Sequence, residues 1–200
     1  MKLMFAPPSP YARKARVTVL EKGLQDSVEF VAVNPMNDDP TLLTNNPLSK
    51  IPALQLDDGT SMVDSAQICE YLDGLSATNP LYLTGDQRQQ ILRATYLANG
   101  ILDAAVTARM EQFRPEEIQW QPWVDRQRAA ITRALVQLEP LVKQFDEQIT
   151  IAHITTAIML EYLDFRLGDI DWRGSHPVLA EWLPGFAARD SMQQTQPPTS

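Results

Sequence analysis

Residues 2–33, KLMFAPPSPYARKARVTVLEKGLQDSVEFVAV, decide the fold because strand and helix signals alternate along them. The opening apolar run indicates a strand. Ser9 and Pro10 then begin a helix, since serine is a good N-cap and proline suits the first helical position. Gly23 is a typical helix stop, and residues 28–33 carry the β-branched side chains of a second strand. This order predicts a right-handed crossover between two parallel strands.

The residues that follow complete a small α/β domain. Residues 34–50 are rich in Asn, Asp and Pro, which indicates a loop with at most one irregular helical turn. Two short strand-like runs, 53–56 and 61–63, flank the Asp-Asp-Gly of residues 57–59, a hairpin signal. Ser65 then caps a helix with apolar residues at helical spacing. The predicted order is β-α-β-loop-β-β-α.

The two halves of the chain are unlike. Residues 1–76 form the predicted α/β domain, residues 77–85 a linker, and residues 86–200 a domain with helical signals alone. Pro140 is expected to kink or end one of its helices. The expected helices cover residues 86–113, about 122–145, 151–167 and about 177–189. The third of these is apolar on nearly all sides, which predicts a buried central helix.

Composition excludes several kinds of protein. The 200 residues are 44% hydrophobic and 21% charged, which is typical of a folded globular chain. Seventeen basic and 25 acidic residues give a formal net charge of −8, which disfavours nucleic acid and anionic membrane surfaces as partners. The sequence shows no secretory signal and no apolar run long enough to span a bilayer. We therefore expect a cytoplasmic protein.

Few side chains are available for metal binding or disulfides. Cys69 is the only cysteine, and His153 and His176 are the only histidines, with no acid or cysteine at recognisable ligand spacing. We therefore predict no disulfide and no metal. Cys69 falls on the apolar face of its helix and is predicted to lie in the core.

Three short motifs carry the chemistry. Residues 9–12, Ser-Pro-Tyr-Ala, are similar to the Cys-Pro-Tyr-Cys form of thioredoxin-like redox proteins, but the missing cysteines exclude dithiol exchange there. A hydroxyl at a helix N-terminus can donate a hydrogen bond to an anion, although Ser9 can equally be a plain cap. Pro52 suits the first position of a strand, and the spacing leaves a cis or a trans bond open. Asp64 and Ser65 begin the next helix, as an anion site or as a cap.

Together these motifs resemble the glutathione-binding domain of the glutathione transferase family. The matching pieces are residues 9–11, residues 46–54 (NPLSKIPAL) and residues 64–65. The helical half, including Asp-Phe-Arg at 164–166, is similar to the family's all-α domain. The resemblance covers nearly the whole chain and is nearest a bacterial, YibF-like branch. It implies a thioredoxin-like N-terminal domain followed by an all-α helical bundle.

The resemblance implies a role for each motif. Ser9 would hydrogen-bond the sulfur of glutathione and favour its thiolate, the attacking nucleophile. Ile51 would pair its backbone with the cysteinyl unit of glutathione, and the bond to Pro52 would be cis.

The charged ends of glutathione would meet the remaining residues. Ser65 and its backbone N–H would hold the γ-glutamyl carboxylate, with Asp64 near the amino group. Lys50 would approach the glycine carboxylate, although a solvated loop lysine is the plainer interpretation. Each ligand charge would thus meet an opposite charge or a helix N-terminus.

The second substrate is expected between the domains, against the long helix of residues 86–113. Its candidate contacts are Tyr11, Asn99, Asp103 and Arg109, although an exposed helix face explains these polar residues equally well. The family resemblance also implies a homodimer. The resemblance thus implies a serine-type glutathione transferase, acting in detoxification on a small electrophilic or peroxide substrate, with glutathione as co-substrate.

Two alternatives stay open. One is a non-catalytic binding or scaffold protein with the same fold. The other is a glutathione-dependent peroxidase or disulfide reductase. Ser9 in place of cysteine disfavours a mixed disulfide with the protein, whereas peroxide attack by bound glutathione remains feasible.

The sequence departs from the family at the central helix. A Ser/Thr-x-x-Asp capping box is typical there, whereas residues 150–153 read Thr-Ile-Ala-His. We expect that His153 cannot replace the carboxylate acceptor, at a cost of about 1 kcal/mol. We also expect His153 to be structural rather than a catalytic base.

Overall fold

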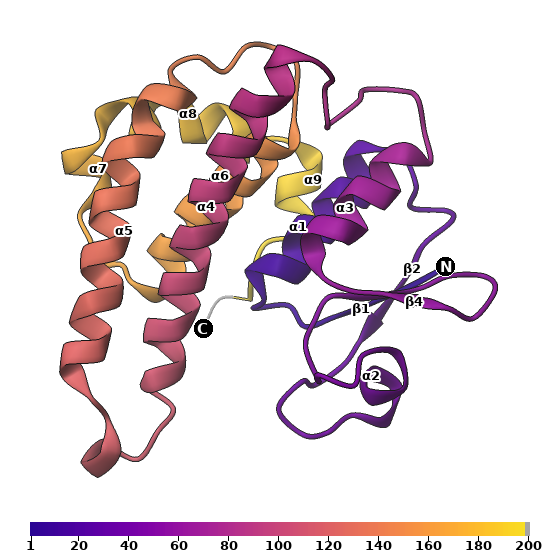
Figure 1. Cartoon of the computed structure of the whole chain (residues 1–200), viewed down its shortest axis with the longest axis horizontal. Helices are drawn as coiled ribbons and strands as arrows, with labels where there is room; N and C mark the ends of the chain where they lie inside the picture. Colours follow the sequence, from indigo (N-terminus) through magenta and orange to yellow (C-terminus); the bar gives the residue numbers. More distant parts are fainter. Residues whose placement is uncertain (199–200) are drawn as a thin grey trace. The chain divides into compact units, whose positions relative to one another are not determined.

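A computed structural model describes residues 1–198 of the chain (Figure 1). It divides into two compact units, one formed by Met1–Tyr82 together with the segment from Ala188 onward, and one formed by Leu83–Ala187. The first boundary falls inside the predicted linker of residues 77–85. Residues 188–200 were expected to belong to the helical domain, whereas the segment from Ala188 groups with the first unit.

A four-stranded sheet forms the centre of the first unit, with strand order β2-β1-β3-β4. Its strands are β1 (Lys2–Phe5), β2 (Glu29–Ala32), β3 (Ala53–Gln55) and β4 (Ser61–Met62). β1 runs parallel to β2 with Leu3 opposite Phe30, and antiparallel to β3 with Leu3 opposite Leu54. β4 pairs antiparallel with β3. The predicted crossover and hairpin are therefore confirmed.

Three helices belong to the same unit: α1 (Pro10–Glu21), α2 (Pro40–Asn45) and α3 (Ser65–Gly74). α1 begins after the Ser9 cap and ends before Gly23, whose φ of +66° is a conformation that glycine adopts without steric cost. α1 packs against α3 (Figure 1). The cap of α3 is Asp64, one residue before the predicted Ser65, because its carboxylate accepts from the Ala66 amide at 2.8 Å.

The C-terminal segment is fastened to α1 by polar contacts and carries the short helix α9 (Asp190–Gln193). Arg13 is 4% exposed, and its guanidinium donates to the Met192 carbonyl at 3.1 Å. Glu21 accepts two hydrogen bonds of 2.9 Å from the Arg189 guanidinium. These bonds explain why the segment groups with the first unit rather than with the helices.

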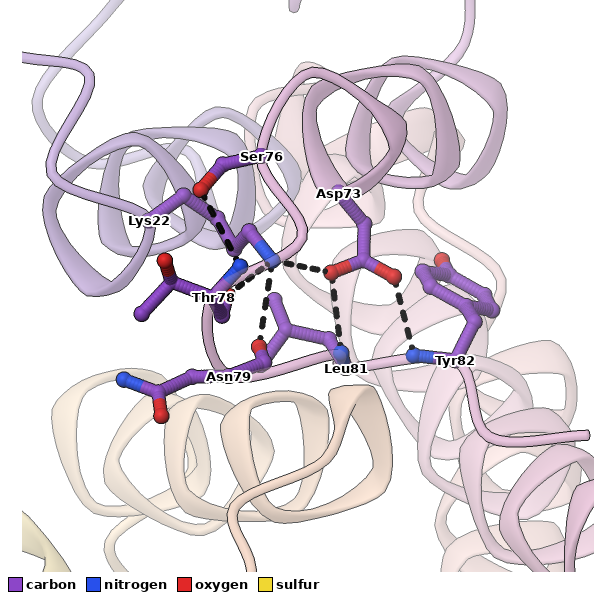
Figure 2. Close-up of polar contacts among 7 residues, drawn as sticks. All are labelled: Lys22, Asp73, Ser76, Thr78, Asn79, Leu81 and Tyr82. Atoms are coloured by element: carbon purple, nitrogen blue, oxygen red, sulfur yellow. Dashed lines mark hydrogen bonds and ion pairs between the residues drawn. The ribbon is translucent and has the colours of Figure 1, made fainter.

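A buried ion pair joins the ends of α1 and α3 to the linker (Figure 2). Lys22 Nζ lies 2.8 Å from Asp73 Oδ1, with side-chain exposures of 0% and 10%. The Asp73 carboxylate also accepts from the amides of Leu81 and Tyr82, at 2.8 and 3.1 Å. The Lys22 ammonium donates in addition to the carbonyls of Thr78 and Asn79, at 2.6 and 3.1 Å.

The second unit is helical throughout. Its helices are α4 (Asp86–Glu111), α5 (Gln121–Val142), α6 (Ile151–Arg166), α7 (Trp172–Ser175) and α8 (Pro177–Ala187), with a 3₁₀ turn η1 (Glu116–Ile118). Every residue from Ile151 to Leu160 is buried, so the predicted central helix is confirmed as α6. α5 continues two residues past Pro140, which lies in its last turn. Within residues 1–198, no helix has the length and apolar character needed to cross a membrane.

The N-terminus of α6 has a complete capping box. The Thr150 amide donates to His153 Nδ1 at 3.3 Å, and His153 Nε2 lies 3.3 Å from the Asp146 carbonyl. An imidazole protonated at Nε2 donates to that carbonyl and keeps Nδ1 as an acceptor. The expectation that His153 cannot complete the box is therefore wrong. His153 is 5% exposed and stacks on Phe145 with ring centroids 4.1 Å apart, a structural role.

Candidate functional site

Ser9 lies at the end of the loop from β1 to α1. Its hydroxyl oxygen accepts a hydrogen bond of 3.2 Å from the Ala12 amide, so the predicted cap is present. The hydroxyl hydrogen bonds to no acceptor within residues 1–198. The cap fixes the oxygen at the positive end of the α1 dipole and leaves the O–H free to donate to a ligand. Capping and ligand binding are thus compatible at Ser9.

The Ile51–Pro52 peptide bond is cis, as the family resemblance implies. The ladder between β1 and β3 begins with the pair Met4 and Ala53, so Ile51 lies just outside the sheet. The Asn46 side chain shapes the preceding loop by donating to the Lys50 carbonyl at 2.7 Å. The Lys50 side chain is exposed.

Asp64 and Ser65 begin α3 with different exposures. The Asp64 carboxylate is exposed although it caps the helix, and the Val63–Asp64 bond is also cis. Ser65 is 6% exposed and occupies the first helical position. Its amide and hydroxyl form no hydrogen bond with any residue among 1–198. The first amides of a helix lack intrahelical partners and are suited to bind an anion.

Strand directions bring the three motifs to one edge of the sheet. Ser9 follows the carboxyl end of β1. β3 is antiparallel to β1, so residues 50–52, which precede β3, lie at that same edge. β4 is antiparallel to β3, so residues 64–65, which follow β4, lie there too. The topology thus directs the N-termini of α1 and α3 toward the edge that also carries the cis-proline loop.

The residues predicted to contact a second substrate are distributed over both units. Tyr11 lies on α1, whereas Asn99 and Asp103 lie one turn apart on α4. Arg109, also on α4, donates to Gln112 Oε1 at 2.5 Å, and its guanidinium carbon lies 4.6 Å from the centre of the Phe113 ring.

Three residues at the end of α6 form a cluster that was not among the predicted site residues. Tyr162 is 8% exposed, Phe165 packs edge-on to it, and the Arg166 guanidinium carbon lies 3.6 Å from the centre of the Phe165 ring. Burial and the positive charge of Arg109 lower the pKa of Arg166. Burial raises the pKa of Tyr162, and the charges of Arg166 and Arg109 oppose that rise. A polar residue and a cation one turn apart on an apolar helix were the signal that could have found them.

The helical unit also has a hollow of about 70 Å³ near the start of α6. His153, Phe145 and Gln90 line it together with neighbouring residues of the same unit. None of the predicted site residues borders it, so this hollow does not identify the site.

No group of three or more His, Cys, Asp or Glu side chains within residues 1–198 is arranged to hold a metal ion.

Known proteins share this architecture along its whole length. Residues 8–75 match the family model for the glutathione S-transferase N-terminal domain, and residues 121–183 match the C-terminal domain model. The GST-like protein YibF of Escherichia coli (strain K12) is 32% identical, with 99% of each chain covered. The fold is thioredoxin-like followed by all-α, and the chain belongs to the glutathione transferase family.

Three similar crystal structures contain glutathione or a conjugate. A family member from Pseudomonas fluorescens Pf-5 with bound glutathione is 41% identical over 99% of each chain, with a TM-score of 0.95. A Pseudomonas fluorescens Pf-5 structure with bound S-(propanoic acid)-glutathione is 40% identical over 100% of each chain, with a TM-score of 0.91. A glutathione S-transferase from Methylobacillus flagellatus KT with glutathione bound is 34% identical over 98% of this chain and 99% of that one, with a TM-score of 0.92.

Proposed function

We propose that this protein is a serine-type glutathione S-transferase, which activates the thiolate of bound glutathione for attack on a small electrophile. The observation that carries this proposal is the meeting of the Ser9, cis-Pro52 and Asp64–Ser65 motifs at one edge of the sheet. Glutathione bound to the similar bacterial structures supports it.

Ser9 is the catalytic residue of the proposal. Its oxygen is held by the Ala12 amide, so its hydrogen donates to the glutathione sulfur. A free thiol has a pKa of about 8.5 and is mostly protonated at neutral pH. A donated hydrogen bond and the α1 dipole favour the charged form, so the pKa of the bound thiol falls. The resulting thiolate is the nucleophile.

The remaining residues bind the rest of glutathione. The Ser65 amide and hydroxyl hold the γ-glutamyl carboxylate, and the exposed Asp64 carboxylate attracts the amino group. The Ile51 backbone, which lies outside the β1–β3 ladder, pairs with the cysteinyl unit. The Lys50 ammonium attracts the glycine carboxylate.

The second substrate is an electrophile that contacts Tyr11, Asn99, Asp103 and Arg109. The Pseudomonas fluorescens Pf-5 structure holds a conjugate with a carboxylic acid on the sulfur, which favours electrophiles that give acid-bearing products. The family resemblance further supports a cytoplasmic homodimer that acts in detoxification. Its glutathione domain is the unit that contains residues 1–76, and its substrate domain is the helical unit Leu83–Ala187.

Calorimetric titration with reduced glutathione tests the proposal. We expect micromolar to millimolar binding that weakens in Ser65→Ala. Ser27→Ala removes an exposed hydroxyl from the same unit and is expected to leave the affinity unchanged. Absence of binding to the unmodified protein would contradict the proposal and favour the scaffold alternative.

A further inference from the structure

The Asn46 side chain holds the loop that leads to the cis-proline. Asn46 directly follows α2 and is 2% exposed. Its Nδ2 donates to the Lys50 carbonyl at 2.7 Å, and its Oδ1 accepts from the Leu48 amide at 3.1 Å. The Asn46 carbonyl also accepts from the Ser49 amide at 3.0 Å. One buried residue therefore fixes the whole turn that precedes Ile51.

Ser49 attaches the same loop to the segment before α2. Its backbone has a φ of +52°, in the left-handed region that residues other than glycine seldom adopt. Its hydroxyl donates to the Pro35 carbonyl at 3.1 Å. A strained conformation of this kind persists only where the surrounding contacts fix it, and such residues cluster at ligand sites. The loop thus has a defined conformation before any ligand binds.

The Lys50 carbonyl and the Ile51 amide belong to one peptide group. That peptide is trans, so its C=O and N–H bonds point in opposite directions. Because the carbonyl is bound to the buried Asn46, the Ile51 N–H is directed away from Asn46. The Ile51 side chain packs against the buried cluster that contains Leu42 and Ala53, which fixes the residue itself. Within residues 1–198 the Ile51 amide forms no hydrogen bond.

We propose that Asn46 is a positioning residue for glutathione: by binding the Lys50 carbonyl, it directs the Ile51 amide to the cysteinyl carbonyl of the ligand. The inference rests on the proposed function and names the side chain that presets one of its contacts. The bond from Asn46 also polarises the peptide group, which makes the Ile51 N–H a stronger donor. Without that bond the peptide group would be ordered only when glutathione binds, at a cost in affinity.

Asn46→Asp tests this role with almost no change of shape. The carboxylate still accepts from the Leu48 amide but cannot donate to the Lys50 carbonyl. In calorimetric titration of the full chain with reduced glutathione, we expect about tenfold weaker binding, as for the loss of one hydrogen bond. Asn46→Ala loses both bonds and is expected to bind glutathione at least as weakly. A role limited to shaping the turn would leave the affinity of Asn46→Asp unchanged.

Asn45→Asp is the matched control, because it adds the same charge at the neighbouring position, which is 7% exposed. The Asn45 side chain donates to the Thr41 carbonyl at 2.8 Å, inside α2 rather than in the loop before Ile51. This variant is expected to bind glutathione as tightly as the unmodified protein. Circular dichroism and urea denaturation check that each variant is folded, and Asn46→Ala carries the test if Asn46→Asp does not fold.

Hydrogen exchange of the Ile51 amide, followed by NMR, gives a readout that a purely structural role would not change. Saturating glutathione should slow the exchange of this amide in the unmodified protein, and less so in the Asn46 variants at equal saturation. Asn46→Asp that binds as tightly as Asn45→Asp, or an Ile51 amide that glutathione does not protect, overturns the inference. If the unmodified protein does not bind glutathione, the proposed function fails, and this inference with it.

Discussion

The Lys22 ammonium and the Asp73 carboxylate form an ion pair of 2.8 Å that is almost closed to water. Lys22 lies just after α1 and Asp73 near the end of α3, so the pair fixes two helix ends against each other. The linker amides of Leu81 and Tyr82 bind the same carboxylate (Figure 2). Asp73 therefore neutralises a buried charge and orders the linker.

Asp73→Ala should lower the free energy of unfolding by about 3–5 kcal/mol, because it leaves the buried Lys22 charge without a partner. Urea denaturation followed by circular dichroism measures the change. Lys2→Ala, which breaks the exposed pair with Glu29, is the control and should cost less than about 1 kcal/mol. An equal effect of the two variants would contradict the prediction.

Ser9→Ala should reduce conjugation of glutathione to an electrophile by about a hundredfold, as expected for loss of a donor to developing negative charge. The pKa of bound glutathione, followed by thiolate absorbance against pH, should rise toward its free value. Ser9→Thr keeps the hydroxyl and the cap and should retain most activity. Loss of the cap costs about 1 kcal/mol, so folding is checked separately. If conjugation and peroxide turnover were both unchanged in Ser9→Ala, the role given to Ser9 would be wrong.

Glu21 should make the free energy of unfolding depend on pH. Burial alone would raise its pKa, but hydrogen bonds from Arg189 and Ser191 and the Arg189 charge outweigh burial and lower the pKa below 4.5. The ionised form is therefore favoured by folding, and its contribution is present above pH 4.5 and lost as the pH falls through the folded pKa. In Glu21→Gln, the free energy of unfolding, measured by urea denaturation at several pH values, should fall less steeply below this pH than in the unmodified protein. Glu147→Gln, at an exposed position, should keep the original slope.

Cys69 should be unreactive in the native protein. It is fully buried, burial raises the pKa of its thiol, and the Thr18 hydroxyl lies 3.3 Å from its sulfur. Since the thiolate is the reactive form, iodoacetamide should label Cys69 only after unfolding. Mass spectrometry with and without urea measures this. Labelling of the native protein faster than its unfolding would show that the thiol is accessible.

Local signals explain how much of the fold could be predicted from the sequence. The Ser9 cap, the Gly23 stop and the hairpin at residues 57–59 act within a few residues, so the order of strands and helices followed from them. The four-residue helices α7 and α9 were missed because they are too short to show a period. The cap of α6 was misjudged because the hydrogen-bonding role of His153 depends on its tautomer, which the Asp146 carbonyl favours.

Long-range contacts explain why part of the candidate site and the division into two units could not be predicted from the sequence. The residues at the sheet edge could be named because each lies beside a recognisable turn or helix start. Arg13 is buried because its guanidinium bonds to Met192, which is distant in sequence, and no local pattern predicts that contact. The proximity of Arg166 to Arg109 could not be predicted because the two residues lie on different helices. Pairings of this kind have no local pattern.

The attachment of the segment after Ala187 to α1 has a consequence for biosynthesis. The first unit is made of two stretches of chain, with residues 83–187 translated between them. At about 5–20 residues per second, translation of residues 83–187 takes about 5–20 s, so the partners of Arg13 and Glu21 are made that long after the first stretch ends at Tyr82. During that interval the nascent first unit has its sheet but lacks α9 and the bonds from that segment to Arg13 and Glu21. The first unit is therefore the part of the chain most exposed to chaperones and proteases.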